Sequence, residues 1–480
     1  MNRSAITSLS ASEAPATGAS FSTLALPPAQ IANLESLGYS SMTPVQAASL
    51  PAALEGDDLI VQAQTGSGKT AAFALALLAK LTLDNQTQPF AVQALVLCPT
   101  RELADQVTTE IRRLARSEDN VKTLTLCGGV PLRNQQASLA HGAHVVVGTP
   151  GRVLDHLDRG ALPLDALKTL VLDEADRMLD MGFVDDIAKV AKRCPKLRQT
   201  LLFSATYPEG IAQLAQQFMR GPKTITVRSQ VDPAQIEQRF YEVRDTDRLH
   251  AVSTLLLHFR PASTIAFCNT KQQCRDLVAV LRGQGFAALA LHGELEQRER
   301  DQVLVQFANR SCSVLVATDV AARGLDIAQL EAVINVDTTP DASLHIHRIG
   351  RTGRADAKGL ALSLASLDEM GSVGKIELVQ RSEVTWYPLA SLAAAPGGML
   401  LPAMVTLQIV GGRKEKIRPG DVLGALTGEA GFAASQVGKI NVNEFSTYVA
   451  VDRQIAKQAL AALSGGRIKG KKVKVRFVED

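Results

Sequence analysis

The stretch DLIVQAQTGSGKT, residues 58–70, joins a short apolar run to a glycine-rich turn and leads into a helical pattern. Such a turn between a strand and a helix presents backbone N–H groups to phosphate oxygens, and the helix N-terminus adds a favourable dipole. Lys69 is then placed to reach the β- and γ-phosphates of a nucleotide, and the Thr70 hydroxyl to hold Mg²⁺. The residues expected to line the phosphates are Gln64, Thr65, Gly66, Ser67, Gly68, Lys69 and Thr70.

A second stretch, TLVLDEAD at 169–176, strengthens the hypothesis of a nucleotide site. Taken alone, the glycine-rich octet also fits an ordinary turn, because such octets occur by chance. Its first position is Ala63 and not glycine. Asp173 ends an apolar strand, where its carboxylate can join the shell of a Mg²⁺ ion. Glu174 follows directly and can orient and deprotonate an attacking water. Acids at strand ends also cap helices, but a Lys-Thr loop on an earlier strand favours the catalytic interpretation.

Short apolar runs alternate with helical patterns along most of the chain, which predicts parallel sheets covered by helices. We expect α/β domains at 21–228 and 238–385, separated by a polar, Pro-containing linker. Residues 1–20 are rich in Ser, Ala and Thr and are expected to form a disordered tail. A small domain at 403–480 has the order βαββαβ, the ferredoxin-like plan of RNA-recognition modules. In the two larger domains, strands are expected at 58–63, 94–99, 144–150, 169–175, 199–205, 224–227, 264–270, 287–293, 313–319 and 332–337.

Positive charge gathers at the end of the chain. The whole chain has a formal net charge of +3, whereas residues 403–480 carry 13 Lys/Arg against 7 Asp/Glu. The basic excess therefore lies in the small domain and indicates a polyanion as its partner, with a solvated basic face as the alternative.

Cysteine use and hydropathy indicate the compartment. The chain has 6 cysteines, none in a CxxC pair or beside histidines at metal-ligand spacing. We therefore expect reduced core thiols in a cytoplasmic protein. The longest apolar run, AAFALALLA at 71–79, is too short to span a bilayer, so no membrane partner is expected.

In their order along the chain, these motifs resemble those of the DEAD-box RNA helicases. The match covers roughly 21–385 and includes the letters DEAD at 173–176. Alanine at position 63 is usual in that family. The resemblance implies two tandem RecA-like domains, ATP with Mg²⁺ as cofactors, and RNA as partner. It also implies that Phe21 and Gln46 recognise the adenine and that Asp176, Ser204 and Thr206 couple the nucleotide site to RNA.

The stretch HRIGRTGR at 347–354 lies in the second α/β domain. By resemblance, Arg351 and Arg354 are arginine fingers that enter the ATP site of the first domain, and they share one helical face if the segment is helical. The resemblance further implies that Asp326 holds the ribose and that Arg323 and His347 help to form the closed, active arrangement.

The resemblance also outlines an RNA track of backbone N–H groups, hydroxyls and arginines at strand ends. That chemistry binds phosphates and sugars without reading bases, and aromatic residues make up only 4% of the chain. The implied contacts are Pro99, Thr100, Arg101, Gly129, Thr149, Gly151, Arg152, Thr270, Gln297, Arg300, Thr318 and Asp319.

The small domain departs from the usual RNA-recognition pattern. When the aromatic motif of these modules is laid on EFSTYVAV at 444–451, only Tyr448 and Val449 keep their types. Base stacking on the sheet is therefore not expected. The stretch RPGDVLGALTG resembles the C-terminal domain of DbpA-type DEAD-box proteins, which implies binding to a hairpin of large-subunit ribosomal RNA and a role in assembling that subunit. The expected contacts are Arg413, Lys414, Lys416, Arg418, Arg467, Lys469, Lys471, Lys472 and Lys474.

Three functions can be separated at this stage. The favoured one is a monomeric, ATP-dependent RNA helicase that locally unwinds or remodels ribosomal RNA in pre-ribosomal particles. A non-enzymatic RNA chaperone or scaffold with an inert nucleotide site is the alternative, and the presence of Lys69, Asp173 and Glu174 argues against it. A DNA helicase is disfavoured by the motifs and by the RNA-type C-terminal domain.

Overall fold

The computed structural model describes residues 18–64, 66–83, 90–118, 120–207, 209–227, 236–322, 330–353, 358–396 and 400–478. The chain divides into two compact units, the first from Met1 to Gln230 and the second taking in most of the chain from Val231 to Asp480. The first unit contains one sheet and the second contains two.

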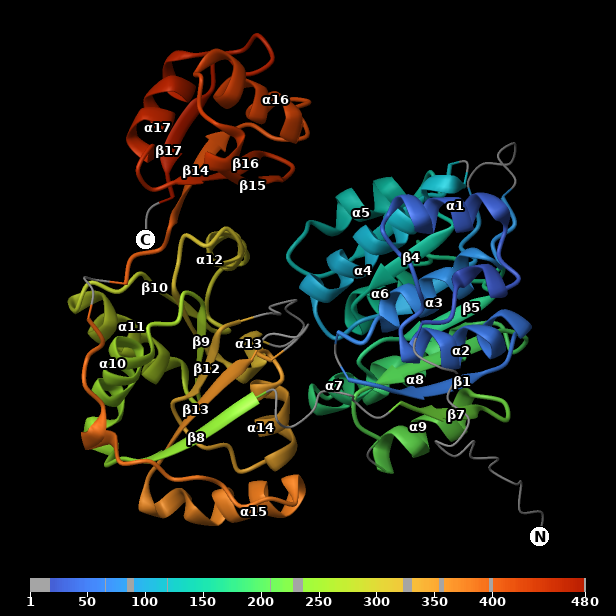
Figure 1. Cartoon of the computed structure of the whole chain (residues 1–480). Helices are drawn as coiled ribbons and strands as arrows, with labels where there is room; N and C mark the ends of the chain where they lie inside the picture. Colours follow the sequence, from blue (N-terminus) through green and yellow to red (C-terminus); the bar gives the residue numbers. More distant parts are fainter. Residues whose placement is uncertain are drawn as a thin grey trace. The chain divides into compact units, whose positions relative to one another are not determined.

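The first unit is built on a seven-stranded parallel sheet in the order β3-β4-β2-β5-β6-β1-β7 (Figure 1). Its strands are β1 (Leu59–Gln62), β2 (Ala94–Leu97), β3 (Thr123–Leu126), β4 (Val145–Gly148), β5 (Thr169–Leu172), β6 (Gln199–Ser204) and β7 (Lys223–Thr226). Its helices are α1 (Pro28–Ser36), α2 (Pro44–Glu55), α3 (Lys69–Leu78), α4 (Arg101–Leu114), α5 (Leu132–Leu139), α6 (Pro150–Asp158), α7 (Ala175–Asp180), α8 (Val184–Arg193) and α9 (Glu209–Phe218).

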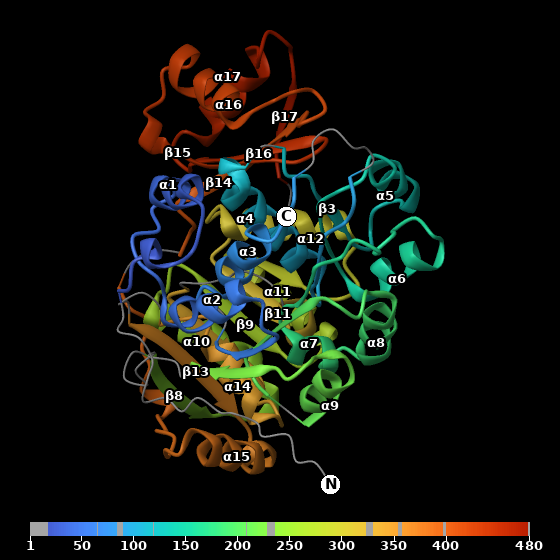
Figure 2. The ribbon, with the colours of Figure 1, turned by 90° about the vertical axis from the view of Figure 1, so that its right-hand side faces the viewer.

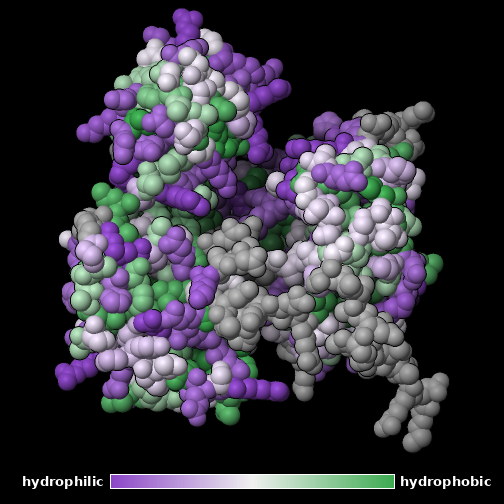
Figure 3. Space-filling view, viewed as in Figure 1, coloured by the Kyte–Doolittle hydropathy of each residue, from purple (hydrophilic) through white to green (hydrophobic). Residues whose placement is uncertain are grey.

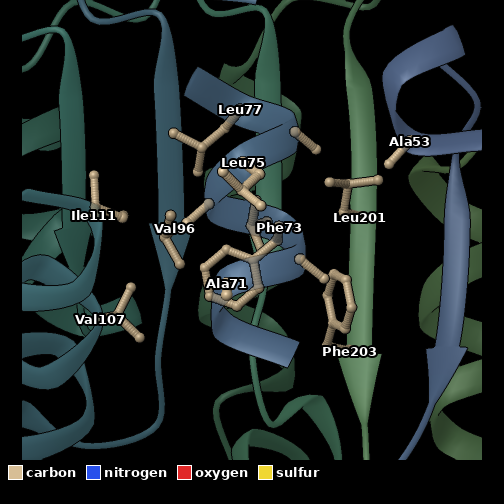
Figure 4. Packing of buried hydrophobic residues seen from close by; sticks show 14 of the residues in the cluster. Ala53, Ala71, Phe73, Leu75, Leu77, Val96, Val107, Ile111, Leu201 and Phe203 are labelled. Atoms are coloured by element: carbon tan, nitrogen blue, oxygen red, sulfur yellow. The ribbon is translucent and has the colours of Figure 1, made fainter. Parts of the chain in front are cut away.

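Successive residues of its central strands face opposite sides of the sheet and enter two separate cores. Val96 of β2 packs into the core with α2, α3 and α4, whereas its neighbour Leu95 packs into the core with α6, α8 and α9. Figure 4 shows α3 lying against β2 and β6, with Phe73 beside Phe203. The centroids of those two rings are 5.4 Å apart. Because α3 is buried nearly all round, its N-terminus, where the glycine-rich loop ends, is held firmly.

The second unit begins with a six-stranded parallel sheet in the order β10-β11-β9-β12-β13-β8. Its strands are β8 (Ile236–Glu242), β9 (Thr264–Cys268), β10 (Ala288–Leu291), β11 (Val314–Thr318), β12 (Ala332–Asn335) and β13 (Gly359–Ala365). Its helices are α10 (Arg248–Phe259), α11 (Lys271–Gly283), α12 (Gln297–Ala308), α13 (Asp319–Ala322), α14 (Ala342–Ile349) and α15 (Met370–Gln380).

The small domain is an antiparallel four-stranded sheet in the order β15-β16-β14-β17. It consists of β14 (Met404–Val410), α16 (Pro419–Gly424), β15 (Val437–Val442), β16 (Ser446–Asp452), α17 (Ala456–Gly465) and β17 (Lys474–Phe477). Figures 1 and 2 both show α16 and α17 on one face of this sheet. Leu407, Ile409, Val449 and Val451 point to that face and form the core with the two helices.

The predicted fold class is confirmed: two parallel-sheet RecA-like domains precede a ferredoxin-like domain of order βαββαβ. Each expected strand is present, and the structure adds three that the sequence analysis did not name: β3, β8 and β13. Strand β8 begins at Ile236, inside the predicted linker 228–237. The exact domain ends stay predictions, and most of the tail 1–20 lies outside the described residues.

The six cysteines are free and buried, as expected for core thiols. Within the part of the chain that the structure describes, we find no helix long and apolar enough to cross a membrane.

Candidate functional site

The carboxyl ends of parallel strands meet at one edge of a sheet. Apart from Phe21 and Gln46, the predicted site residues of the first unit follow six strands of its sheet. The neighbours β5, β6 and β1 lead into the acidic motif, the SAT stretch and the glycine-rich loop. The neighbours β3, β4 and β2 lead into the predicted RNA contacts. The strand order therefore separates this edge into two adjoining halves, one for each predicted ligand.

The glycine-rich loop is held in place by its own residues. Gly66 and Gly68 have φ values of +83° and +94°, in the left-handed region that favours glycine. The Lys69 ammonium donates to the Ala63 carbonyl oxygen at 2.7 Å, which closes the loop across its base. The Ser67 hydroxyl donates to the carbonyl of Gln64 at 2.7 Å. Thr65 lies outside the described residues.

Gln46 supports this loop from α2. Its Nε2 donates to the Gly68 carbonyl at 3.2 Å, and its Oε1 accepts the Thr43 backbone N–H at 2.9 Å. These two bonds use one of the two amide hydrogens and one of the two oxygen lone pairs, so pairing with adenine stays chemically possible and stays a prediction. A Cβ at Gly68 would collide with the Gln46 side chain, which is a second reason for glycine there. Phe21, the other predicted adenine contact, is buried and packs edge-on against Tyr39.

Asp173 and Glu174 lie buried beyond the end of β5. Desolvation by burial, and then the charge of Glu174, raise the pKa of Asp173 to about 7, while Lys69 acts in the opposite sense. A buried carboxylate whose charged form is this poorly compensated would be stabilised by a cation. The Glu174 Oε2 accepts from Nη1 of Arg177 at 2.8 Å in a buried ion pair, which orients the carboxylate.

Glu174 also has a left-handed backbone, with φ +53° and ψ +52°. For a residue other than glycine, this conformation costs on the order of 1–3 kcal/mol, and such strain tends to occur at functional sites. Arg177 was not predicted from the sequence, although its place three residues after Glu174 was the available signal.

Asp176 joins the acidic motif to the loop after β6, as the predicted coupling role requires. Its Oδ2 accepts the Thr206 backbone N–H at 2.8 Å, the Thr206 hydroxyl at 2.9 Å and the Ala205 N–H at 3.2 Å. The Asp176 N–H donates to the Ser204 hydroxyl at 3.3 Å. Four hydrogen bonds thus tie the acidic motif to the loop after β6, and the coupling role stays a prediction.

The predicted RNA contacts of the first unit gather on the other half of the edge. Thr100 and Thr149 precede α4 and α6 at their N-termini, so both residues lie where helix dipoles favour phosphate. Pro99 and Gly129 follow β2 and β3, and Gly151 lies in the first turn of α6. The Arg101 Nη1 is buried and has no hydrogen-bond partner among the described residues.

Protein groups already use the guanidinium of Arg152. Its Nη1 donates to the Val130 carbonyl and the Gln135 side chain, both at 2.9 Å.

In the second unit, Thr270 follows β9, Thr318 ends β11, and Gln297 and Arg300 lie on α12. Arg300 donates to the Ala321 carbonyl at 2.7 Å. Strands β10, β11 and β9 are neighbours in the sheet, and each predicted contact lies at the end of one of them or in the segment that follows. The predicted contacts are thus brought to one edge of the sheet.

Asp319 has a strong partner within the protein. Its carboxylate accepts two hydrogen bonds from the Arg348 guanidinium, at 2.7 Å and 2.6 Å. Arg348 is only 1% exposed and also donates to the Asp337 carbonyl and the Asn269 side chain, at 2.8 Å and 3.1 Å. It therefore ties together the ends of β11, β12 and β9. Arg348 was not predicted from the sequence, because nothing in the motif HRIGRTGR distinguishes it from Arg351 and Arg354.

The premise that Arg351 and Arg354 share a helical face is not met. Helix α14 ends at Ile349, and Arg351 lies in the turn beyond it, where the Leu330 N–H donates to its carbonyl. Turn geometry ends the 3.6-residue repeat on which the premise depended. His347 lies in the last turn of α14. Arg354, Arg323 and Asp326 lie outside the described residues.

The nine basic residues predicted for the small domain are all exposed. The Lys469 ammonium donates to the Lys416 carbonyl at 2.8 Å, so the two basic segments, 413–418 and 467–474, lie side by side. Figure 3 shows hydrophilic residues over much of this domain in that view.

An aromatic residue that the sequence analysis did not single out lies beside these basic loops. Phe445, in the turn between β15 and β16, is 60% exposed, and the Lys414 ammonium lies 4.3 Å from its ring centroid. The loop 411–414 is bonded to this turn through the N–H groups of Gly411, Arg413 and Lys414. An exposed aromatic ring is thus present on a turn and not on the sheet.

Family models match all three domains. They are the DEAD/DEAH box helicase at residues 43–214, the helicase conserved C-terminal domain at 247–356 and the DbpA RNA binding domain at 406–477. The chain is 52% identical to the ATP-dependent RNA helicase DbpA of Escherichia coli, over 96% of this chain and 99% of that protein. It is 38% identical to the DbpA of Bacillus subtilis, over 92% and 96%. The chain belongs to the DbpA family of DEAD-box ATP-dependent RNA helicases. An RNA- and ADP-BeF3-bound Dbp5 of Saccharomyces cerevisiae is similar in structure, with a TM-score of 0.69 and 31% identity over 77% of this chain and 96% of that one.

Membership of this helicase family decides between the functions left open by the motifs. The chain is an ATP-dependent RNA helicase, so the interpretation as a non-enzymatic scaffold is wrong. The site also fits ATP, because Gly66, Gly68 and Lys69 lie at the N-terminus of α3, where backbone N–H groups and the helix dipole favour phosphate. Among the described residues no cluster of three metal-ligating side chains occurs.

Proposed function

We propose that this helicase remodels large-subunit ribosomal RNA during assembly of the subunit, and that its small domain selects the RNA by binding a hairpin. The observation that carries this proposal is the exposed basic surface of residues 413–418 and 467–474 beside the exposed ring of Phe445. Positive loops hold the phosphates of an RNA hairpin, and an unpaired loop base can stack on an aromatic ring. RNA hairpins supply both features, whereas a regular duplex supplies only the first.

In the proposed reaction, backbone N–H groups of Gly66 and Gly68 and the Lys69 ammonium bind the phosphates of ATP. Thr70 and Asp173 would hold Mg²⁺, which supplies neutralisation of phosphate charge. Glu174, oriented by Arg177, takes the proton of the attacking water. Arg351 and Arg354 are proposed to stabilise the transition state from the second domain. The hydrogen bonds of Asp176 to the SAT loop are proposed to make hydrolysis respond to RNA.

Unwinding is proposed to be local. A base-pair step is worth about 1.4 kcal/mol, taking the figure for DNA stacking. One closure of the two helicase domains on the RNA is therefore proposed to separate only a few base pairs. The proposed RNA track contacts phosphates and sugars, which suits such non-specific strand separation, while selection of the RNA is left to the small domain.

We propose a monomer that works in the cytoplasm on pre-ribosomal particles and without a membrane partner. The buried, free cysteines support a reducing compartment.

The proposed RNA surface is tested with paired double variants of the full-length protein. Lys471→Ala with Lys472→Ala removes two charges from the basic loops, and Lys439→Ala with Lys457→Ala removes two exposed charges elsewhere in the same domain. We expect the first pair to weaken binding of a ribosomal RNA hairpin and to reduce the slope of log K against log salt by about 1 to 2. The control pair should change the slope less. Equal effects of the two pairs, or equal binding of hairpin and random RNA by the unchanged protein, would argue against the proposal.

A further inference from the structure

One buried amide lies among the predicted RNA contacts of the first unit without belonging to any of their motifs. Gln135 of α5 is 6% exposed, and a buried amide is costly unless it is hydrogen-bonded. Its Nε2 donates to the carbonyl of Cys127, the residue after β3, at 2.9 Å. Its Oε1 lies 2.9 Å from Nη1 of Arg152 and 2.9 Å from Nε2 of His156, both on α6. Gln135 therefore joins the end of β3 to α6.

These bonds leave the amide and the histidine only one arrangement of protons. Because the Gln135 nitrogen faces a carbonyl, the opposite oxygen is the acceptor for both Arg152 and His156, so His156 carries its proton on Nε2. The His156 Nδ1 is buried and has no hydrogen-bond partner in the described part of the chain. Burial, and then the charge of Arg152, lower the pKa of His156. The neutral ring is thus a fixed donor behind the amide.

The same amide oxygen fixes the direction of the Arg152 guanidinium. Nη1 donates both to Gln135 and to the carbonyl of Val130, each at 2.9 Å, and Val130 follows the predicted RNA contact Gly129. A guanidinium is a rigid plane, so two bonds at one nitrogen set where its other donors point. Its Nε lies 3.6 Å from the Asp155 carboxylate, and the Arg152 side chain is 17% exposed. Among the described residues, these contacts leave Nη2 for a ligand.

We propose that Gln135 is a positioning residue for RNA binding that acts through Arg152. It holds the guanidinium, and with it the loop that contains Gly129, in the arrangement that meets the RNA backbone, so this half of the edge is formed before RNA arrives. Side chains that are ordered in advance lower the entropy cost of binding. The inference rests on the proposed RNA track, in which Arg152 contacts a phosphate, and adds to it a residue that itself touches no RNA.

The test measures the RNA concentration that half-maximally stimulates phosphate release by the full-length protein. The RNA is a ribosomal RNA hairpin with a single-stranded extension, the same for every variant. Gln135→Met keeps a side chain of similar length but lacks the amide. We expect it to raise the half-maximal concentration by about threefold or more, while the rate at saturating RNA stays within about twofold. Gln136→Met, at a neighbouring position of α5 that is only partly buried, is the control and should change neither quantity.

A double-variant cycle with Arg152→Ala separates positioning from a general effect on the fold. Arg152→Ala alone should raise the half-maximal concentration by about threefold or more, and adding Gln135→Met should raise it by less than about twofold further. If the two effects multiply, or if Gln135→Met alone has no effect, the positioning role is overturned and the proposed RNA track stands. If Arg152→Ala has no effect, the proposed contact itself fails, and the inference fails with it.

Thermal unfolding checks that each variant folds. If Gln135→Met is unfolded at the assay temperature, Gln135→Asn takes its place in the same cycle, because its shorter amide cannot reach Arg152 and Cys127 together. Gln135→Asn should also raise the half-maximal RNA concentration, and an unchanged value would overturn the inference.

Discussion

The nucleotide edge of the first sheet and the basic loops of the small domain are both suited to phosphate groups, but they treat charge in opposite ways. Asp173, Glu174, Lys69 and Arg177 are each no more than 6% exposed, and each is held by bonds to the protein. The basic residues of the small domain are all exposed, and Phe445 is 60% exposed. Cleavage of a phosphate bond needs fixed charges in a site of low dielectric, whereas capture of a polyanion needs charges that solvent and ligand can reach. Substitutions at the nucleotide edge should accordingly change the rate of ATP hydrolysis and the stability of the fold. Substitutions at the basic loops should change the affinity for RNA.

The largest expected effect comes from Glu174→Gln. Loss of the general base should reduce ATP turnover in the presence of RNA by about 10²- to 10⁴-fold, while hairpin binding by the small domain stays unchanged. The measurement is steady-state phosphate release, with thermal unfolding as a control because the buried Arg177 loses its charged partner. Turnover within tenfold of the unchanged protein, in a variant of normal stability, would remove Glu174 from the proposed role.

The next largest effect concerns the buried carboxyl group of Asp173. Its pKa is raised to about 7, mainly by burial, so the folded protein holds the proton more tightly than the unfolded chain does. The contribution of the protonated carboxyl to the free energy of unfolding is complete below the ordinary pKa of a carboxyl. It is lost as the pH rises from there through about 7.

Asp173→Asn, which is always neutral, should therefore stabilise the nucleotide-free protein by up to a few kcal/mol at pH 8.5, and by roughly half as much at pH 5.5. Thermal unfolding at the two pH values measures the difference. Asp185→Asn, at an exposed acid of α8, is the control and should show little change. A stabilisation by Asp173→Asn that is equal at both pH values would contradict the assignment of burial as the cause.

Gly412→Ala tests whether the basic loop of the small domain depends on its scaffold. A Cβ at Gly412 would collide with the Asn443 carbonyl, where the loop pairs with the turn that carries Phe445. We expect a loss of about 1–3 kcal/mol in the stability of the small domain, together with weaker hairpin binding and unchanged ATP turnover without RNA. Gly420→Ala, where a Cβ meets nothing within 4 Å, is the control. Equal unfolding temperatures of the two variants would show that the loop adapts without cost.

The smallest effect is expected for Phe445→Ala. Base stacking on an aromatic ring is worth about 1–3 kcal/mol, and the exposure of this ring places it at the lower end, roughly a tenfold loss of hairpin affinity. Phe445→Tyr should keep the affinity, and neither change should alter ATP turnover without RNA. If Phe445→Ala binds the hairpin as well as the unchanged protein does, the small domain captures RNA by charge alone.

The short motifs were predictable because their chemistry is local. A glycine turn after an apolar strand, two acids at a strand end and a cluster of lysines keep their meaning wherever the chain folds. The strands that were not named show the limit of this approach. Strand β8 is polar and lies at a sheet edge, and β13, GLALSLA, consists largely of Ala and Leu, which favour helices equally well. Their pairing with neighbouring strands, and not their composition, makes them strands.

By itself, therefore, the sequence determined the fold class and the family, and it predicted which residues bind ATP. Only the tertiary structure decided which strands adjoin, and hence that the predicted nucleotide and RNA residues lie on two halves of one edge. It also decided that Arg177 and Arg348 are buried and hold neighbouring segments together. In the small domain it decided that Phe445 is exposed whereas Tyr448 is buried. The physical reason is that burial and ion pairing depend on residues far away in the chain. The contact of Thr406 with Ser311, 95 positions earlier, leaves no trace in the local pattern around either residue.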